Sequence, residues 1–341
     1  MNSTLFIINT EYHLLNALIV VLKDSKPEKE YVFLFVKQGN RFVKSYNIPF
    51  KTVIIPNEFG SPYLFGKRFN IKKFYQENLK NIDVVYCFVD NEFINTYFIN
   101  RLKKEGSEIR LIQEGLNAYI KTYKNISLRK KINREIKYYL FKYILGYNCI
   151  QKFKEWGSNP NVDKIYLLSP EKGRNKVHKL DISVNSDQLK KVETYLNIEN
   201  SNIDQIENSI IFFSQGFFTA KIREKELIIL KQVAQLAESQ NKKFYLKLHP
   251  REKMDTAEAL VKLKGVKLLD GGIPSELILL KTKRSIVFSW YSASLLFYVD
   301  TNAYFWAYPL LFDNLNIPDH LFPYIKRINS NEQLRLMIKN N

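Results

Sequence analysis

Short apolar runs alternate with amphipathic segments along the first half of the chain. The amphipathic segments predict helices over Tyr12–Leu22 and near residues 70–80 and 92–105. This alternation of strands and helices predicts a parallel sheet with helices on both faces. The apolar runs predict strands at Leu5–Ile8, Tyr31–Val36, Thr52–Ile55, Val84–Val89 and Ile109–Ile112.

A second alternation follows a polar stretch at residues 183–208, which is rich in Asn, Ser and Asp and lacks a strong core pattern. We place a domain boundary there, between domains spanning 1–195 and 205–341. The chain is therefore predicted to be an α/β protein with two Rossmann-like domains facing a central cleft. In the second domain we expect strands at Ser209–Phe213, Lys243–Leu248 and Ser285–Phe288, and helices at Glu224–Ser239, Glu276–Leu280 and Ala293–Val299.

Composition adds an electrostatic constraint. The 341 residues include 52 Lys and Arg against 34 Asp and Glu, which gives a net charge of +18. Such a charge favours an anionic partner. Nucleic acid is not expected, because the basic residues form no recognised nucleic-acid motif. Cys87 and Cys149 have no metal-ligand spacing and suggest no disulfide framework, and the lack of such a framework is typical of proteins in a reducing cytoplasm. The opening residues predict a strand rather than a signal peptide.

The most informative segment ends the strand before residue 250. An apolar run stops at a basic cluster formed by Lys247, His249, Pro250 and Arg251. Proline ends the strand, so His249 lies where a strand meets a loop, which is where open α/β sheets bind ligands. The flanking cations suit a phosphate. A histidine that is simply hydrogen-bonded at a strand end is the alternative.

A carboxylate follows the strand Ile109–Ile112 in the same way. Glu114 stands at its exit, after Gln113 and before Gly115. Glycine permits a tight turn and close approach of a ligand. Glu114 could act as a general base with a pKa raised by partial burial. The alternative is a turn or helix-start glutamate.

Three further turns contain candidate ligand-binding residues. Backbone N–H groups at a strand-to-helix turn bind anions, whereas N-capping is the alternative role for serines there. The Pro-Ser-Glu turn offers Glu276 for a ribose diol, or as part of a capping turn. The candidates are Ser292 and Ser294 after the strand Ser285–Phe288, Ser214, Gln215 and Gly216 after the strand Ser209–Phe213, and Glu276.

The sequence lacks the common metal-binding and nucleotide-binding motifs of other protein classes. It has no GxGxxG, Walker A, HExxH or paired CxxC motif. Asp90-Asn91-Glu92 is a weak match to the acidic metal-binding triplet of some glycosyltransferases. We expect no metal and no cofactor.

The acidic-Gly, His-Pro and serine motifs occur in an order that resembles the bacterial sialyltransferases of lipooligosaccharide and capsular polysialic acid synthesis. The resemblance implies a GT-B fold and a CMP-sialic acid donor without a required metal. It implies that Glu114 is the catalytic base and that His249 assists departure of the nucleotide phosphate. Ser292 and Ser294 would hold this phosphate, and Glu276 the ribose. The family has a second acidic residue where this chain has Gln113.

The resemblance predicts an inverting glycosyltransferase that moves sialic acid to a hydroxyl of a surface polysaccharide or lipooligosaccharide. The nucleotide would contact Ser214, Gln215, Gly216, Lys247 and Pro250 as well, and the acceptor would lie near Thr10, Gly115 and Asn117. Alternatives are a transferase for another CMP-keto-acid or nucleotide-diphosphate sugar, and a nonenzymatic protein that binds polyanions or membrane surfaces.

The segment 119–156 breaks the strand–helix rhythm. It carries ten Lys or Arg against two acids, interleaved with aromatic residues. Such a segment could contact anionic lipid at the inner face of the cytoplasmic membrane, or hold an anionic glycan acceptor. A solvated basic helix is the third reading. We expect a cytoplasmic protein with a peripheral contact to anionic membrane.

Overall fold

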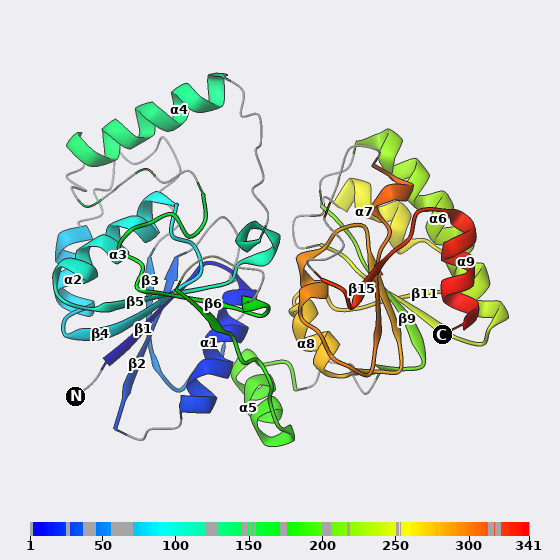
Figure 1. The fold of residues 1–341 in the computed structure, drawn as a ribbon, viewed down its shortest axis with the longest axis horizontal. Helices are drawn as coiled ribbons and strands as arrows, with labels where there is room; N and C mark the ends of the chain where they lie inside the picture. The colour runs from blue at the N-terminus through cyan, green and yellow to red at the C-terminus, as the bar shows by residue number, and fades with distance from the viewer. Residues whose placement is uncertain are drawn as a thin grey trace. The chain divides into compact units, whose positions relative to one another are not determined.

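The computed structural model describes residues 3–24, 28–36, 46–55, 71–119, 128–144, 149, 152, 155–170, 176–199, 206–216, 219–249, 252, 254–312, 317 and 322–340. The chain forms two compact units, residues 1–199 and 200–341 (Figure 1). The predicted Pro250 and Arg251 lie outside the described residues.

Unit 1 is built on a parallel sheet with the strand order β3-β2-β1-β4-β5-β6-β7. The chain moves outward from β1 in one direction and then crosses to β4, so the order reverses between these two neighbours. Ligands bind at such a reversal in open α/β sheets. The strands are β1 (Ser3–Ile8), β2 (Glu30–Val36), β3 (Lys51–Ile55), β4 (Ile82–Cys87), β5 (Glu108–Ile112), β6 (Lys164–Leu167) and β7 (Val177–Lys179).

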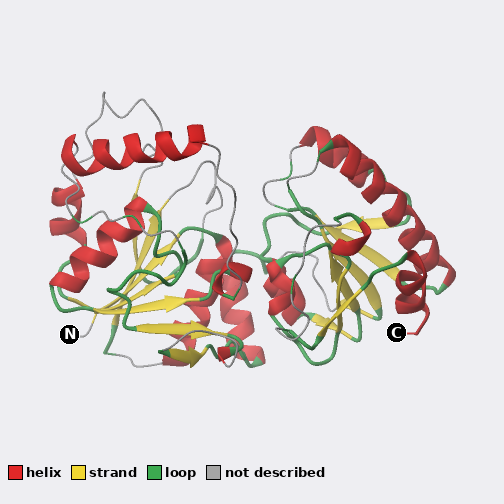
Figure 2. Cartoon of the chain, turned by 45° about the horizontal axis from the view of Figure 1, so that its top comes forward, coloured by secondary structure: helices red, strands yellow, loops and turns green. Residues whose placement is uncertain are grey.

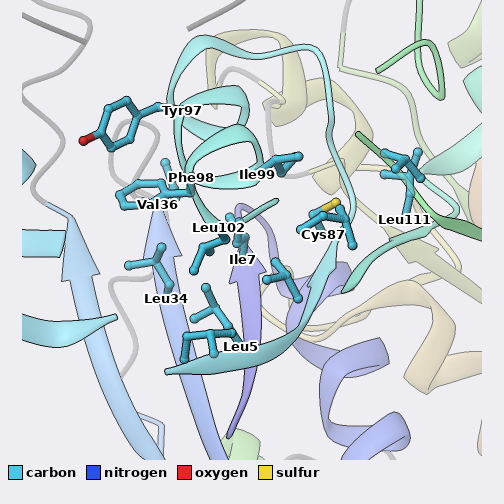
Figure 3. Close-up of a cluster of buried hydrophobic side chains, with 14 of the residues drawn as sticks. Leu5, Ile7, Leu34, Val36, Cys87, Tyr97, Phe98, Ile99, Leu102 and Leu111 are labelled. Carbon is cyan, nitrogen blue, oxygen red and sulfur yellow. The ribbon is translucent and has the colours of Figure 1, made fainter. Parts of the chain in front are cut away.

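Helices cover both faces of this sheet (Figures 1 and 2). All six residues of β1 are buried, as expected for a parallel strand covered on both sides. Figure 3 shows Leu5 and Ile7 of β1 close to Phe98 and Leu102 of α3, within one buried apolar cluster. The helices are α1 (Glu11–Asp24), α2 (Ile71–Asn78), α3 (Phe93–Lys104), α4 (Leu128–Tyr139) and α5 (Ser186–Leu196).

Unit 2 repeats the same topology. Its main sheet has the order β11-β10-β9-β13-β14-β15, again parallel throughout, so the order reverses between β9 and β13. The strands of this sheet are β9 (Ser209–Phe213), β10 (Lys243–Lys247), β11 (Val266–Leu268), β13 (Ile286–Ser289), β14 (Ala303–Trp306) and β15 (Ile325–Arg327); β8 (Ile206–Glu207) pairs with β12 (Thr282–Lys283). The helices are α6 (Ala220–Ser239), α7 (Met254–Val261), α8 (Ser275–Leu280) and α9 (Asn331–Asn340).

One helix was not predicted, and one prediction about local structure is wrong. The segment 183–208 contains α5, which starts with a reciprocal capping box between Asn185 and Gln188 and buries Val192 and Leu196. Two buried apolar residues in a polar segment are too few to give a helical pattern of hydrophobic positions in the sequence. The helix predicted over Ala293–Val299 is a 3₁₀ turn, Ala293–Leu296, that ends because Phe297 leaves helical geometry.

A buried cluster of charges joins the start of α6 to Glu252, which follows β10 in the chain. Arg223, in the first turn of α6, forms ion pairs with Glu226 and with Glu252. Trp290 Nε1 donates a hydrogen bond to Glu226 Oε1 at 2.6 Å. The Ser214 hydroxyl donates to Glu252 Oε2 at 3.2 Å. Because each carboxylate here is paired and hydrogen-bonded, the cluster can exist in a dry interior.

This cluster predicts a pH dependence of stability. Burial raises the pKa of Glu226 to about 7, against the opposing effects of Arg223 and Trp290. In the unfolded chain the Glu226 carboxyl has its ordinary pKa of 4.5 and releases its proton more readily than in the folded protein. The free energy of unfolding therefore falls as the pH rises from about 4.5 to about 7. Relative to Glu226→Gln, the wild type should lose roughly 2–3 kcal/mol of unfolding free energy between about pH 5 and pH 8. Urea unfolding of both proteins at each pH measures this; a difference that stays constant contradicts it.

Candidate functional site

The carboxyl edge of the unit 1 sheet begins with the turn between β1 and α1. The Thr10 hydroxyl accepts a hydrogen bond from the His13 backbone N–H at 3.3 Å, so Thr10 caps α1. Thr10, predicted on the acceptor side, therefore already has a structural role at this edge.

The His13 side chain is fully buried at this edge. Its Nδ1 accepts a hydrogen bond from the Asn9 backbone N–H at 3.1 Å. Its ring stacks on Phe88, with centroids 4.3 Å apart and planes 4° apart. Its Nε2 lies 3.5 Å from Glu114 Oε1, and within the described residues this nitrogen makes no hydrogen bond.

The turn after β5 places Glu114 beside this histidine. Gly115 has a φ of 58°, in the left-handed region that glycine adopts without strain, and begins a 3₁₀ helix over Gly115–Ala118. The Glu114 side chain is 35% exposed. Its carboxylate therefore reaches solvent while one oxygen faces a buried imidazole. Asn117, one turn further, is exposed.

Gln113 has a different role from the second acidic residue that the resemblance implies. It is buried, and its Oε1 accepts hydrogen bonds from the Tyr119 hydroxyl at 2.5 Å and from the Leu168 backbone N–H at 2.9 Å. These bonds join the exit of β5 to the exit of β6. Gln113 thus fixes the turn that carries Glu114.

The acidic triplet at 90–92 is partly a structural element. Asp90 is completely buried, and its two oxygens accept the backbone N–H groups of Gly157 and Asn159 at 3.0 and 3.1 Å. Glu92 stands before α3 without a side-chain capping bond. In the described part of the chain, no three His, Cys, Asp or Glu residues are grouped as a metal site.

In unit 2, three neighbouring strands bring the predicted nucleotide-binding residues to one edge. The strands β10, β9 and β13 are parallel neighbours, so their carboxyl ends meet. Ser214, Gln215 and Gly216 follow β9, Lys247 and His249 lie at the end of β10, and the serine turn follows β13.

Hydroxyl groups organise the serine turn. Ser289 Oγ accepts hydrogen bonds from the Ser292 backbone N–H at 3.0 Å and from Gln215 Nε2 at 3.3 Å. Ser292 Oγ accepts from the Ser294 backbone N–H at 3.2 Å. The capping role considered from the sequence is therefore present at Ser292, and Gln215 ties the turn to β9 across the reversal of strand order.

Two of the predicted nucleotide-binding side chains, Ser294 and Lys247, interact with a third, Glu276. Burial raises the pKa of Glu276, and this rise is opposed by a hydrogen bond from its own backbone N–H, by a hydrogen bond from Ser294 and by the positive charge of Lys247. Lys247 is itself buried, and its Nζ donates to the Gly271 carbonyl at 3.3 Å. Glu276, Ser294 and Lys247 thus form one polar cluster at this edge.

Ser214 connects this edge to the buried charges below it. Its hydroxyl accepts the His249 backbone N–H at 2.8 Å and donates to Glu252, as described above. The Glu252 backbone N–H in turn donates to the His249 carbonyl at 2.8 Å. The conformation of the His249 turn therefore rests on Ser214 and, through Glu252, on Arg223.

Sequence reasoning missed two groups of residues that hold these turns. His13 and its neighbour Asn9 follow the first predicted strand, so the strand-exit argument applied to His249 and Glu114 could have found them. Arg223, Glu226 and Glu252 carry no such signal, because their pairing joins residues that are distant in sequence and lie in different elements.

Comparisons with known proteins identify the fold and the family. A sequence model of the alpha-2,8-polysialyltransferase (POLYST) family matches residues 4–300. The GT-B domain of a sialyltransferase from Photobacterium damselae has a similar structure, with a TM-score of 0.54 and 13% identity over 99% of this chain and 97% of that chain. No curated protein matches the sequence.

Two further solved structures are more distant. The ADP-heptose LPS heptosyltransferase II of E. coli has a TM-score of 0.45 and 9% identity over 100% of this chain and 99% of that chain. The UDP-GlcNAc 2-epimerase of Methanocaldococcus jannaschii has a TM-score of 0.49 and 12% identity over 100% and 92%.

The GT-B fold predicted from the sequence is confirmed by the Photobacterium structure. The prediction of a sialyltransferase is confirmed at the level of the family. The match covers most of the chain, so this protein is a glycosyltransferase that belongs to the alpha-2,8-polysialyltransferase family.

Proposed function

We propose that the protein transfers sialic acid from CMP-sialic acid to a hydroxyl of a bacterial surface polysaccharide or lipooligosaccharide, with inversion at the anomeric carbon. The observation that carries the proposal is the partly exposed Glu114 carboxylate at the carboxyl edge of its sheet. The family match supports sialyl transfer as the chemistry.

In the proposed reaction Glu114 takes the proton of the acceptor hydroxyl as this oxygen attacks the anomeric carbon. The bond from that carbon to the CMP oxygen breaks, and its electron pair leaves on the phosphate. A single displacement inverts the anomeric centre. The acceptor would lie near Thr10, Gly115 and Asn117.

Unit 2 would stabilise the departing nucleotide. His249 and the turn of Ser292 and Ser294 would donate hydrogen bonds to the phosphate, where negative charge develops. Glu276, beside Ser294 and Lys247, would bind the ribose diol. Ser214, Gln215, Gly216 and Pro250 would shape the nucleotide site. The reaction would need no metal, because protein groups neutralise the phosphate.

Glu114→Gln should lower transfer by roughly 100-fold or more, because the amide keeps the shape of the side chain but cannot accept the proton. CMP binding should be retained, since the nucleotide is assigned to unit 2. Initial rates with CMP-sialic acid and a sialylated acceptor, together with CMP titration calorimetry, measure both.

Glu92→Gln is the matched control for this variant, because it alters another carboxylate at the same edge of the sheet and should leave the rate nearly unchanged. Normal turnover in Glu114→Gln contradicts the assignment of the base. Turnover with UDP-sugars or another CMP-keto-acid sugar, and none with CMP-sialic acid, contradicts the assignment of the donor.

His249→Ala should lower both transfer and the slow hydrolysis of CMP-sialic acid, roughly 100-fold, because both need the phosphate to leave. His178, exposed on β7 of unit 1, provides the control: His178→Ala should retain both activities. CMP release measured with and without acceptor separates the two reactions. Loss of transfer with normal hydrolysis would instead place His249 on the acceptor side.

We propose secondly that α4 binds anionic membrane at the cytoplasmic face. Five apolar or aromatic residues on this helix and the π turn Leu140–Ile144 are exposed, at spacings that place them on one helical face. The face carries Leu128 (72% exposed), Ile132 (49%), Ile136 (61%), Tyr139 (54%) and Tyr143 (67%).

Charge and location support a lipid surface as the occupant of this face. The exposed Arg129 and Lys131 and the partly exposed Arg134 belong to the same helix, and apolar area next to basic charge is what binds a peripheral helix to anionic lipid. The helix lies at the periphery of unit 1 (Figure 1). Two other aromatic residues of the basic stretch, Phe141 and Trp156, are buried in the core. No helix in the described ranges is long and apolar enough to cross a membrane.

Replacing Leu128, Ile132 and Ile136 together with serine should weaken binding to phosphatidylserine vesicles about tenfold or more, because burial of these side chains contributes to partitioning. Lys131→Glu with Arg134→Glu should weaken the part of binding that falls as salt rises. Cosedimentation measures both. Ile228→Ser, at an exposed isoleucine of α6, is the control.

Activity on a short soluble acceptor should be unchanged in these α4 variants. A loss of that activity would favour an acceptor site on α4. Unchanged vesicle binding and unchanged activity would identify α4 as a solvated helix.

A further inference from the structure

We propose that His13 is a positioning residue that fixes the carboxylate of Glu114 through its Nε2–H group. This inference rests on the proposed role of Glu114 as the base. The acidic-Gly, His-Pro and serine motifs do not include His13, which lies 101 positions before Glu114 in the chain. The fold brings the two side chains together by placing the exits of β1 and β5 at one edge of the sheet.

The hydrogen bonds of the ring define its tautomer. The Asn9 backbone N–H donates to Nδ1 at 3.1 Å, so Nδ1 carries no proton. The proton of the neutral ring is then on Nε2. This is the nitrogen that faces Glu114 Oε1 at 3.5 Å.

The ring cannot turn away from this direction without losing its contacts. Phe88 stacks on one of its faces in a nearly parallel arrangement. Asn9, which supplies the N–H, is held by two amide hydrogen bonds to Asn95 of α3, at 3.3 and 3.0 Å. Asn95 also donates to the Val89 carbonyl at 2.9 Å. A row of buried polar groups therefore connects α3, the exit of β4 and the exit of β1 to Glu114.

The unsatisfied Nε2 is the second observation that points to the carboxylate. Buried polar atoms in folded proteins nearly always have a hydrogen-bond partner, yet Nε2 makes no hydrogen bond within the described residues. Glu114 Oε1 can complete this bond by a shift of about half an ångström, since N–H···O bonds are typically about 2.9–3.0 Å long. Holding Oε1 in this way leaves Oε2 to take the proton of the acceptor hydroxyl.

Two substitutions at His13 test the roles of its two ring nitrogens separately. An asparagine at position 13 can keep an acceptor for the Asn9 N–H but loses the donor toward Glu114, whereas a glutamine can place an amide N–H near the position of Nε2. His13→Asn should lower kcat roughly 10- to 100-fold, as expected for the loss of a hydrogen bond to a charged group, with KM little changed. His13→Gln should recover most of this loss, and thermal unfolding of both variants checks that they fold.

The coupling between the two residues provides a stricter test. In a Glu114→Ala background, His13→Asn should cause no further loss of the residual rate, because the group on which it acts has been removed. Equal losses in His13→Asn and His13→Gln, or multiplicative losses in the double variant, overturn the proposal.

A measurement without turnover keeps this inference separate from the proposed function. In the NMR spectrum of protein labelled with ¹⁵N at histidine, the signals come from four imidazole rings. The signals of His13 are assigned as those that are lost in His13→Gln. The proposal requires an Nε2–H tautomer whose ¹⁵N–H resonance shifts in Glu114→Ala but not in Glu92→Gln. An Nδ1–H tautomer, or no response to Glu114→Ala, overturns it even if the wild type turns over CMP-sialic acid; a wild type without this activity contradicts the proposed function alone.

Discussion

The parallel direction of the strands determines where chemistry can occur in this protein. Parallel strands deliver every loop that follows a strand to the same edge, and the reversal of strand order leaves room for ligands there. In unit 1 the reversal lies between β1 and β4, and in unit 2 between β9 and β13. His13, Glu114, His249 and the serine turn all follow strands and therefore lie at these edges.

Buried polar groups give each edge a defined shape. In unit 1, Asn9 and Asn95 fix the exit of β1, where His13 faces Glu114, and Gln113 fixes the turn that carries Glu114. In unit 2, the pairs of Arg223 with Glu226 and Glu252 extend through Ser214 to the backbone of His249. Such contacts are strong in a dry interior and costly when incomplete. A network of buried polar contacts thus holds each proposed reactive group in position.

The sequence predicts much of the fold, because the central strands are buried on both faces and read as continuous apolar runs. The strand Ser209–Phe213 is predicted with its observed limits for this reason. The helix α5 is missed, because only Val192 and Leu196 anchor it. Ala293–Leu296 is a 3₁₀ turn rather than part of a longer helix. The start of this turn depends on the capping by Ser292, and its end depends on the backbone conformation of Phe297.

The candidate site was predictable to the extent that its residues follow apolar runs. Glu114 and His249 can be found in this way, and their catalytic roles stay predictions. The contacts of these residues could not be predicted from the sequence, because pairs such as Asn9 with Asn95, or Ser214 with Glu252, join segments that only the folded chain brings together.

We propose that unit 2 binds a CMP-activated sugar at the carboxyl edge of β9, β10 and β13. This binding site can be located in a crystal of the protein soaked with CMP. We expect the phosphate within hydrogen-bond distance of His249 and of the turn at Ser292 and Ser294, with the ribose hydroxyls at Glu276. Binding of CMP away from His249, or a site that accepts UDP and excludes CMP, would show that the donor site is assigned wrongly.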